Sequence, residues 1–529
     1  MKQDKASLPG IFPAALVLSL IILAVRLFTL QVVQGAELSQ KAEQNRIKVQ
    51  VLPATRGVIY DQRGEILARN TPQGREYPLK AAAAHVIGYV GEADETELTA
   101  FTVDLGATIG KMGVEREEDK VLRGSNGGIV VETDSAGEPI RELSRNEPIP
   151  GEDLHLFLDK DLQAAVFAAL AEKKGAVVAT TPEGQVLALA SSPSFDPNVL
   201  SRQSSPVDSQ QEEIKQILSD SDQPMFNRAI GGQYPPASTF KIVTGTAGLE
   251  TGKISAQEEI EDTGEIKIGK FRFGNWYFDQ YGKKEGMVNM VKAFQRSNDI
   301  YFYRVGERLG ITQLAAWAKA FGLGEPTNIA LKGEAQGLVP DAEWKEKVQN
   351  ESWYLGDTYI TAIGQGNLQT TPIQVNQMAA VIASGGQLCR PELVNQGQNS
   401  ECQQVPIKPE TLKVVREGMK QACQTGGTGW PLFNFRVKNE GLIKRVDGID
   451  FFHEASDSAD AVRVPVACKT GTAEYGDPED KTHAWFTVFA PVQNPEIVVT
   501  VILEGAGQGS DEAAPVAKKV LETWFNHQK

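Results

Sequence analysis

The sequence predicts an α+β fold whose sheet is built from the two ends of one domain. Two apolar runs, at 175–180 and 185–191, are joined by the turn residues Thr-Pro-Glu-Gly, which is typical of a strand hairpin. Helical periodicity precedes them at 160–174 and returns at 510–527. Three more strand-like runs occur far downstream, at 464–469, 483–490 and 496–503. The pattern therefore predicts a five-stranded antiparallel sheet backed by terminal helices, with an all-helical lobe inserted between its two groups of strands.

The length and charge of the chain limit its domain number and its partners. With 529 residues it exceeds one ordinary hydrophobic core, so we expect at least two domains. The formal net charge of −15 argues against a nucleic-acid partner, because phosphate binding relies on clustered lysine and arginine. A solvated acidic surface is the simpler interpretation.

The cysteines do not form a recognisable metal or redox motif. Four cysteines are too few for a disulfide scaffold, and none has the C-x-x-C spacing of a zinc or redox site. The sequence therefore predicts no metal. Cys389 and Cys402 flank a polar run and would close a small loop if this part of the protein faces an oxidising compartment; the sequence leaves that pairing open.

An apolar segment near the N-terminus is predicted to anchor the chain in a membrane. The run at 11–33 is long enough to cross a bilayer, and its single charged residue, Arg26, lies near the outer end. Lys2 and Lys5 precede it, which places the N-terminus in the cytoplasm by the positive-inside rule. A cleaved signal peptide is the alternative, but no clear small-x-small cleavage site follows a short apolar region. We therefore expect an uncleaved anchor with the bulk of the chain outside the cytoplasm.

Between the anchor and the sheet, the sequence predicts a small, elongated, non-catalytic module. Alternating apolar residues on both sides of the tripeptide at 62–64 predict two strands joined by a turn. Residues 78–150 mix short strands, glycine turns and charged helical pieces. Outside this module, after the first two predicted strands, residues 201–222 are expected to form a polar, mobile loop. The predicted divisions are a cytoplasmic tail and anchor at 1–34, the module at 35–153 and the sheet domain at 154–529.

A short motif in the middle of the chain predicts an activated nucleophile. Two prolines precede Ser238 closely and none follows within residues 237–250, so Ser238 is expected in the first turn of a helix. Helical spacing then places Lys241 on the same face. A serine hydroxyl becomes a nucleophile when a neighbouring base takes its proton, and an amine with a lowered pKa can do this. The spacing favours Ser238 as nucleophile and Lys241 as base, although S-x-x-K alone also arises by chance.

Two further segments carry residue types that such a site needs. Residues 287–308 predict two helical pieces interrupted at 297–299, where polar side chains would project into a cleft; an ordinary helix N-cap is the simpler alternative. Further on, strand alternation places Lys469 and Gly471 on one face. A glycine within a strand often marks the close approach of another backbone. Lys469 would then hold a substrate carboxylate; a solvated edge-strand lysine is the alternative.

The order of the motifs, S-x-x-K, then S-x-D, then K-T-G, is close to the set known from penicillin-binding proteins and class A β-lactamases. The chain resembles a class B penicillin-binding protein of the elongation type. The resemblance runs nearly end to end. It includes the anchor and the segments RGVIYD (56–61), LD (158–159) with Gln163, NRA (227–229), YPP (234–236), WYLGDT (353–358), AIGQG (362–366) and AWF (484–486).

The resemblance implies a peptidoglycan D,D-transpeptidase that serves cell-wall elongation and cell shape. Such an enzyme cross-links stem peptides through an acyl-serine intermediate and releases D-alanine, with D,D-carboxypeptidase action as a possible side activity. The implied fold is a transmembrane helix, a pedestal of the dimerisation-domain type and a serine transpeptidase domain of the β-lactamase-like class.

Individual site residues also follow from the resemblance. Ser238 would be the nucleophile, Lys241 its base and Ser297 the proton relay to the leaving amine. The backbone N–H groups of Ser238 and Thr472 would form the oxyanion hole. The substrate would be bound by Asp299, Lys469, Thr470, Gly471 and Thr472.

The same resemblance implies the ligands, partners and location. Stem peptides ending in D-Ala-D-Ala would be the substrates, and β-lactam antibiotics, which imitate that end, would acylate Ser238. A SEDS-type glycan polymerase and rod-shape scaffold proteins are expected partners. The catalytic domain would lie on the periplasmic side of the inner membrane, and no cofactor is expected.

The sequence departs from the family pattern at several positions. Asp299 stands where many relatives carry asparagine, and its charge would pair with a lysine. Cys468 stands where a small residue is usual; we expect a buried, inert thiol with Cys423 as a possible neighbour. Residues 431–463 look like an insertion. The interval between the first two motifs contains no histidine or cysteine, so the zinc ligands of some relatives are not expected here.

Two other functions are compatible with parts of the pattern. Ser238-Thr239-Phe240-Lys241 is also the spelling favoured by class D β-lactamases and β-lactam sensors, although no matching Tyr-Gly-Asn element is present. The other alternative is a scaffold that activates a SEDS-type polymerase and whose own chemistry is dispensable.

Overall fold

The computed structural model describes residues 11–103, 106–134, 136, 138–171, 173–201, 207–397, 400–438 and 461–527. The chain divides into two compact units. The first consists of Met1–Gly57 with Arg123–Glu152, and the second of Val58–Leu122 with Asp153–Lys529.

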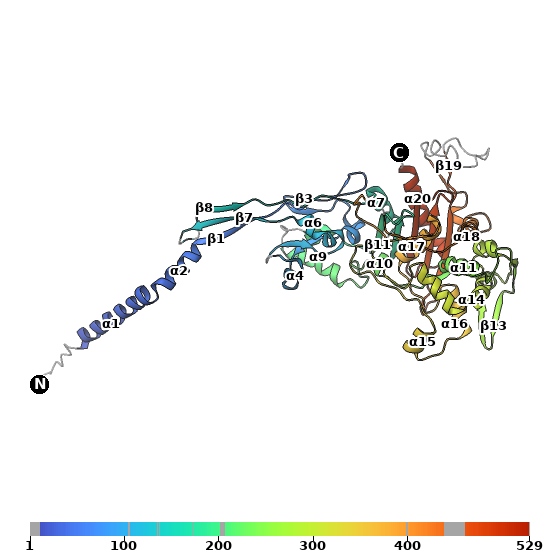
Figure 1. Cartoon of the computed structure of the whole chain (residues 1–529), viewed down its shortest axis with the longest axis horizontal. Helices are drawn as coiled ribbons and strands as arrows, with labels where there is room; N and C mark the ends of the chain where they lie inside the picture. The colour runs from blue at the N-terminus through green and yellow to red at the C-terminus, as the bar shows by residue number, and fades with distance from the viewer. Residues whose placement is uncertain are drawn as a thin grey trace, which may run out of the picture. The chain divides into compact units, whose positions relative to one another are not determined.

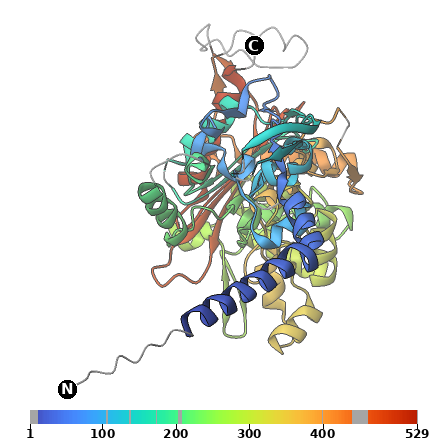
Figure 2. The same ribbon diagram turned by 90° about the vertical axis from the view of Figure 1, so that its left-hand side faces the viewer.

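The first unit combines an apolar helix with a three-stranded sheet. α1 (Ile11–Phe28) continues through one π-helical turn (Thr29–Val33) into α2 (Gly35–Arg46), and both helices are blue in Figures 1 and 2. The helical segment Phe12–Val33 is long and apolar enough to cross a membrane, as the sequence predicts. The antiparallel strands have the order β1–β7–β8: β1 (Ile47–Leu52), β7 (Gly127–Thr133) and β8 (Pro139–Asn146).

The second unit begins with the predicted strand hairpin. β2 (Ile59–Tyr60) and β3 (Ile66–Thr71) pair antiparallel. In the turn between them, Asp61 Oδ1 accepts hydrogen bonds from the backbone N–H groups of Arg63 and Glu65, at 2.8 Å each. β4 and β9 extend the sheet to the order β4–β3–β2–β9. The remaining elements of this part are β4 (Gly74–Glu76), α3 (Ala84–Ile87), β5 (Val90–Glu92), α4 (Glu95–Phe101), β6 (Thr108–Gly110), α5 (Gly113–Glu117), α6 (Asp119–Arg123) and β9 (Leu154–His155).

The central sheet confirms the prediction that both ends of one domain form a single five-stranded sheet. Its order is β11–β10–β22–β21–β20, and all neighbours are antiparallel. Figure 1 shows the early strands in teal and the late strands in red. The strands are β10 (Gly175–Thr180), β11 (Val186–Ser192), β20 (Ala467–Glu474), β21 (Thr482–Ala490) and β22 (Ile497–Leu503).

Both faces of this sheet are buried, which explains the nearly continuous apolar runs in its strands. On one face, Val177 packs in a core with the terminal helices α7 (Lys160–Leu170) and α20 (Ala514–His527). On the other face, Val178 packs in a core with α17 (Pro372–Ser384) of the inserted lobe. Successive residues of a strand point to opposite faces, so the alternation places terminal helices and lobe on opposite sides.

The lobe was predicted to be all-helical; it is mainly helical and also contains short hairpins that the sequence did not reveal. β12 (Ile260–Asp262) pairs with β15 (Gly286–Val288), and β13 (Glu265–Ile268) pairs with β14 (Phe271–Gly274). Strands of three or four residues are too short for alternation to be recognised. The helices are α11 (Lys241–Glu250), α12 (Trp276–Tyr281), α13 (Met290–Arg296), α14 (Asp299–Ala320), α15 (Ala342–Gln349), α16 (Leu355–Ala362), α17 and α18 (Pro409–Ala422).

The prediction of a polar loop at 201–222 was wrong for most of that segment. Residues Val207–Ser219 form the helix α9, while 202–206 lie outside the described residues. Ile214 and Ile217 are half-buried and three residues apart, a helical spacing that the polar composition hid.

Two disulfides join the four cysteines. Cys389 and Cys402 link β16 (Gln387–Cys389) to β17 (Cys402–Gln404), with Cα atoms 4.0 Å apart. Cys423 bonds to Cys468 with Cα atoms 5.8 Å apart. The prediction of a free thiol at Cys468 was therefore wrong, although Cys423 is its neighbour as expected, because α18 packs against β20. Of the predicted insertion at 431–463, residues 439–460 lie outside the described residues.

Candidate active site

Ser238 lies in a 3₁₀ turn, Ala237–Phe240, that leads directly into α11. This agrees with the predicted first helical turn, except that the turn is tighter than an α-helix. Ala237 has a positive φ of 49°, and its N–H donates to Gly364 O at 2.7 Å. The Ser238 side chain is half-buried, and no residue in the described part of the chain hydrogen-bonds to its hydroxyl. The turn therefore fixes the backbone of Ser238, while its hydroxyl has no hydrogen-bond partner among the described residues.

Ser297 occupies the predicted break between α13 and α14. Its backbone is left-handed, with φ 52° and ψ 39°, a region that non-glycine residues rarely adopt. Asn298 follows as the N-cap of α14, and its side chain accepts from Tyr301 N–H at 2.9 Å. Such backbone strain persists only where surrounding contacts hold it, and it gathers at functional sites.

The Ser297 hydroxyl lies between two buried lysines. Lys469 Nζ donates to Ser297 Oγ at 2.8 Å, and Lys241 Nζ donates to the same oxygen at 3.3 Å and to Ser297 O at 2.8 Å. Both lysines are fully buried. The structure thus brings together the serine of the second motif and the lysines of the first and third.

Asp299 also belongs to this cluster, through its contact with Lys241. Its Oδ1 accepts from Lys241 Nζ at 2.6 Å, and its Oδ2 accepts from Trp276 N–H at 3.0 Å. The expected pairing with a lysine is confirmed. Its backbone N–H donates to Asn275 Oδ1 at 3.1 Å.

The burial of the two lysines changes their acid–base properties. Burial lowers the pKa of Lys241, and the charge of Asp299 opposes that shift in part. Burial lowers the pKa of Lys469 further below its usual value, and the positive charge of Lys241 adds to the effect. An uncharged amine is therefore easier to form here than in water, which is the condition for a lysine to act as a base.

β20 carries the third motif along the side of the Ser238 turn. A Cβ added to Gly471 would lie 2.9 Å from Trp485 Cβ and 3.2 Å from Pro236 O, so the glycine permits the close backbone approach that the sequence predicts. Thr470 Oγ donates to Thr428 Oγ at 2.8 Å. Thr472 O accepts from Gln365 Nε2 at 3.0 Å.

Sequence reasoning missed the residues that hold the second motif in place. Buried Asp262 Oδ2 accepts from Asn275 Nδ2 at 2.9 Å and from Asn298 Nδ2 at 3.0 Å. Asn275 and Trp276 in turn bond Asp299. Asn275 precedes a helix, a position that favours asparagine, but its role in the site depends on contacts across the lobe.

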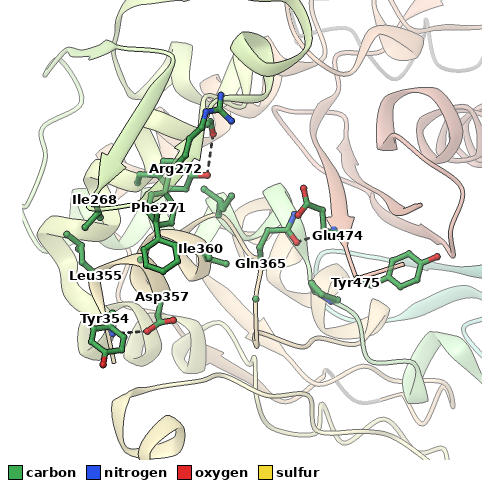
Figure 3. Close-up of a pocket in the computed structure, with 18 of the residues that line it drawn as sticks. Ile268, Phe271, Arg272, Tyr354, Leu355, Asp357, Ile360, Gln365, Glu474 and Tyr475 are labelled. Carbon is green, nitrogen blue, oxygen red and sulfur yellow. Dashed lines mark hydrogen bonds between the residues drawn. The ribbon is translucent and has the colours of Figure 1, made fainter. Parts of the chain in front are cut away.

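A cavity of about 1440 Å³ lies near the cluster of Lys241, Ser297 and Lys469. Its wall includes Gln365 and Glu474 near β20 and, opposite them, residues of β14 and α16 such as Phe271, Arg272 and Ile360 (Figure 3). Ser238, Lys241, Ser297 and Lys469 do not line it. The cavity therefore adjoins the end of β20 that follows the third motif, at Glu474.

Comparison with known proteins decides the family. A model of the penicillin-binding protein transpeptidase domain matches residues 175–522, and one of the penicillin-binding protein dimerisation domain matches residues 71–156. The peptidoglycan D,D-transpeptidase MrdA of Acinetobacter baumannii is 30% identical over 97% of this chain and 86% of its own length. The chain belongs to the class B penicillin-binding proteins of the elongation type. These are the peptidoglycan D,D-transpeptidases that the sequence motifs predict.

Solved structures agree with this family. Penicillin-binding protein 2 of Pseudomonas aeruginosa, in complex with WCK 5153, is 35% identical with a TM-score of 0.74, covering 90% of this chain and 96% of that one. Penicillin-binding protein 2 of Helicobacter pylori in its complex with MreC is 26% identical with a TM-score of 0.75, covering 90% and 98%. A chain of a peptidoglycan synthase complex that coordinates polymerization and crosslinking is 28% identical with a TM-score of 0.75, covering 99% of both chains. The fold thus extends to the pedestal and the anchor region.

Proposed function

We propose that this transpeptidase forms its acyl intermediate on Ser238. The Ser238 Oγ attacks the carbonyl of the penultimate D-alanine of a stem peptide, the peptide bond breaks, and the terminal D-alanine leaves with a proton on its amine. The amine of a second stem peptide then attacks the ester, the ester bond breaks, and Ser238 regains its proton. The product is a cross-link between two peptides.

Lys241 is the base for acylation in this proposal. Support comes from its complete burial and its lowered pKa, which together favour a neutral amine. Lys241 Nζ hydrogen-bonds to Ser297 and Asp299, and a hydrogen bond between base and nucleophile is often completed only when substrate is bound.

Ser297 relays the proton to the leaving amine. The single observation that carries the proposed function is the position of its hydroxyl between Lys241 and Lys469, at 3.3 and 2.8 Å. A hydroxyl both donates and accepts, so it can pass a proton from one side to the other.

The residues of the third motif, which follow one another along β20, would bind the substrate. Lys469 would hold the terminal carboxylate together with Thr470, Gly471 and Thr472, and Asp299 would contact the substrate from the second motif. The backbone N–H groups of Ser238 and Thr472 would stabilise the oxyanion. β-Lactams would acylate Ser238 by the same route.

The proposal also includes the orientation of the protein in the membrane and its partner proteins. The anchor would place the N-terminus in the cytoplasm and the catalytic domain in the periplasm, with domain boundaries at 34 and 153. The resemblance to a relative bound to MreC and to one in a synthase complex supports rod-shape scaffold proteins and a SEDS-type glycan polymerase as partners.

Penicillin labelling tests the nucleophile. We expect detergent-solubilised protein to gain one equivalent of a fluorescent penicillin, mapped by mass spectrometry to Ser238. Ser238→Ala should lose the label completely, whereas Ser219→Ala, at the exposed end of α9, should keep it. Labelling at another residue, or rapid turnover of a chromogenic cephalosporin as in a β-lactamase, would contradict the proposal.

A further inference from the structure

The hydrogen bond between Ser297 and Lys469 joins two elements that are far apart in the sequence. Ser297 is the C-cap of α13, and Lys469 is the third residue of β20. The 2.8 Å between Ser297 Oγ and Lys469 Nζ therefore depends on how far the lobe lies from the edge of the sheet. In the described part of the chain β20 pairs with one strand, β21, so its distance from the lobe is set by other contacts.

One helix, α18, is attached to both of these elements. It packs against α13 and against β20, and it is labelled in Figure 1. A Cβ added to Gly418 of α18 would lie 2.6 Å from Phe294 Cβ of α13, so the two helices approach closely. At the end of α18, the C-cap residue Cys423 forms the disulfide with Cys468 of β20. The helix is thus bonded covalently to the residue that precedes the lysine of the third motif.

The loop that follows α18 makes two further links to the same elements. Gly426 O accepts from Arg296 Nη1 at 2.7 Å, and Thr428 Oγ accepts from Thr470 Oγ at 2.8 Å. Arg296 directly precedes Ser297, and Thr470 directly follows the lysine of the third motif. Both residues that form the central hydrogen bond therefore have a chain neighbour bonded to this one loop.

The disulfide lies beneath this loop, away from the reacting groups. Both cysteines are buried, and a Cβ added to Gly429 would lie 2.5 Å from Cys468 Sγ and 2.9 Å from Cys423 Sγ. Cys468 belongs to the core formed with the terminal helices, and strand alternation turns its side chain to the face opposite Lys469. The disulfide therefore acts on the lysine through the backbone of β20 and takes no part in the chemistry.

The charges of the cluster act against this arrangement. Lys241 and Lys469 both donate to Ser297 Oγ, and a positive charge on Lys241 repels one on Lys469. This repulsion tends to move β20 away from α11. Because α18 packs on α11 as well, its covalent bond to β20 opposes the separation.

We propose that the Cys423–Cys468 disulfide is a positioning element of the active site, which keeps the amine of Lys469 at hydrogen-bond distance from the Ser297 hydroxyl. The inference rests on the proposed function, in which Ser297 relays a proton and Lys469 binds the substrate carboxylate. Without the bond, α18 and β20 remain packed, but their separation is less restricted. A displacement of about 1 Å in a catalytic site can cost about a hundredfold in rate, so we expect a partial relaxation to cost about tenfold.

Alanine substitutions test this proposal. Cys423→Ala, Cys468→Ala and the double variant, each as the detergent-solubilised full chain, are reacted with a fluorescent penicillin at saturating concentration. We expect the first-order rate constant of acylation to fall about tenfold in each. The double variant should be no slower than the single variants, because every one of these changes removes the same bond. The endpoint of labelling measures how much of each protein is folded, on which the rate constant does not depend.

The other disulfide provides the matched control. Cys389→Ala combined with Cys402→Ala removes the bridge between β16 and β17. We expect this variant to unfold at a lower temperature, since the unfolded chain is less constrained, and to keep the native acylation rate. A loss of stability is thereby distinguished from a loss of positioning.

The control variant also permits a reversible test, because Cys423 and Cys468 are its two remaining cysteines. A water-soluble phosphine converts their disulfide into two thiols and becomes a phosphine oxide with oxygen from water. Oxidised glutathione restores the bridge and is released as two molecules of glutathione. Acylation should slow about tenfold on reduction and return to its first rate on reoxidation.

Three results would overturn the proposal. The first is a native acylation rate in the alanine variants, or in protein whose Cys423 and Cys468 thiols are free for alkylation. The second is a double variant that loses the product of the two single losses, because the cysteines would then act separately through packing. In both cases penicillin labelling of Ser238 leaves the proposed function intact. The third, native protein without label at Ser238, overturns the proposed function together with this inference.

Discussion

Asp299 and Lys241 form a buried ion pair at 2.6 Å, an arrangement with opposing effects on a base. Burial lowers the pKa of Lys241, and the Asp299 charge raises it. A general base acts as the neutral amine, so the neutral fraction grows as pH rises through the pKa of Lys241. In the proposed mechanism, where Lys241 is the base, Asp299 thereby sets the pH at which acylation begins.

Asp299→Asn tests this balance. Removing the carboxylate leaves burial unopposed, so the pKa of Lys241 falls further and the rise of the acylation rate with pH should move to lower pH. The measurement is the second-order rate of penicillin acylation across acid, neutral and alkaline pH.

The control is Asp480→Asn, a charge change at an exposed position of the β20–β21 loop, which should leave the profile in place. A shift of the Asp299→Asn profile to higher pH would show that Lys241 is not the base that titrates.

Residue identities were more predictable than their hydrogen bonds. The motifs singled out Ser238, Lys241, Ser297 and Lys469, and three of these four meet through the Ser297 hydroxyl. The hydrogen bonds of Lys241 to Ser297 depend on how α11 and the α13–α14 break are packed, which no local pattern contains. The supporting Asp262 and Asn275 were missed for the same reason.

At the scale of elements, the most informative position is Gly471, where β20 approaches the Ser238 turn. Strand alternation placed it on the face of Lys469, and the added-Cβ distance of 3.2 Å to Pro236 O confirms the close approach to the Ser238 turn. This one residue positions the third motif against the first.

Gly471→Ala should therefore harm catalysis as well as stability. The methyl group would push β20 away from Pro236, at a cost of about 1–3 kcal/mol in the free energy of unfolding. Displacement of the reacting groups should reduce penicillin acylation by about ten- to a hundredfold. Denaturant unfolding and labelling rates measure the two effects.

Gly128→Ala in β7 is the matched control, because an added Cβ there would meet Val49 Cγ1 at an ordinary 3.6 Å. It should change neither quantity measurably. Normal acylation by Gly471→Ala would mean that the close approach has no role in the site.

Elements were predictable where they were long or strongly patterned. The buried strands of the central sheet and the α13–α14 break were found, whereas the hairpins of three- and four-residue strands and the helix α9 were not. The Cys423–Cys468 disulfide depends on α18 packing against β20, a contact between distant segments.

At the scale of the whole molecule, physical patterns predicted the individual helices and strands, and the family resemblance predicted that the three motifs share one site. Apolar runs at both ends of one domain indicated a shared sheet, but the order β11–β10–β22–β21–β20 is set by tertiary packing. The apolar helix Phe12–Val33, long enough to cross a membrane, was predictable from length and hydropathy alone.

Removal of the anchor tests whether the catalytic unit works without it. All proposed site residues belong to the unit Val58–Leu122 with Asp153–Lys529, whereas the apolar helix belongs to the other unit. A chain beginning at residue 35 should therefore stay in the soluble fraction after centrifugation and react with penicillin at the rate of the detergent-solubilised full chain. Ser238→Ala in the truncated chain provides the unlabelled control. A soluble, folded truncation that no longer reacts would mean that residues 1–34 are needed for an active enzyme.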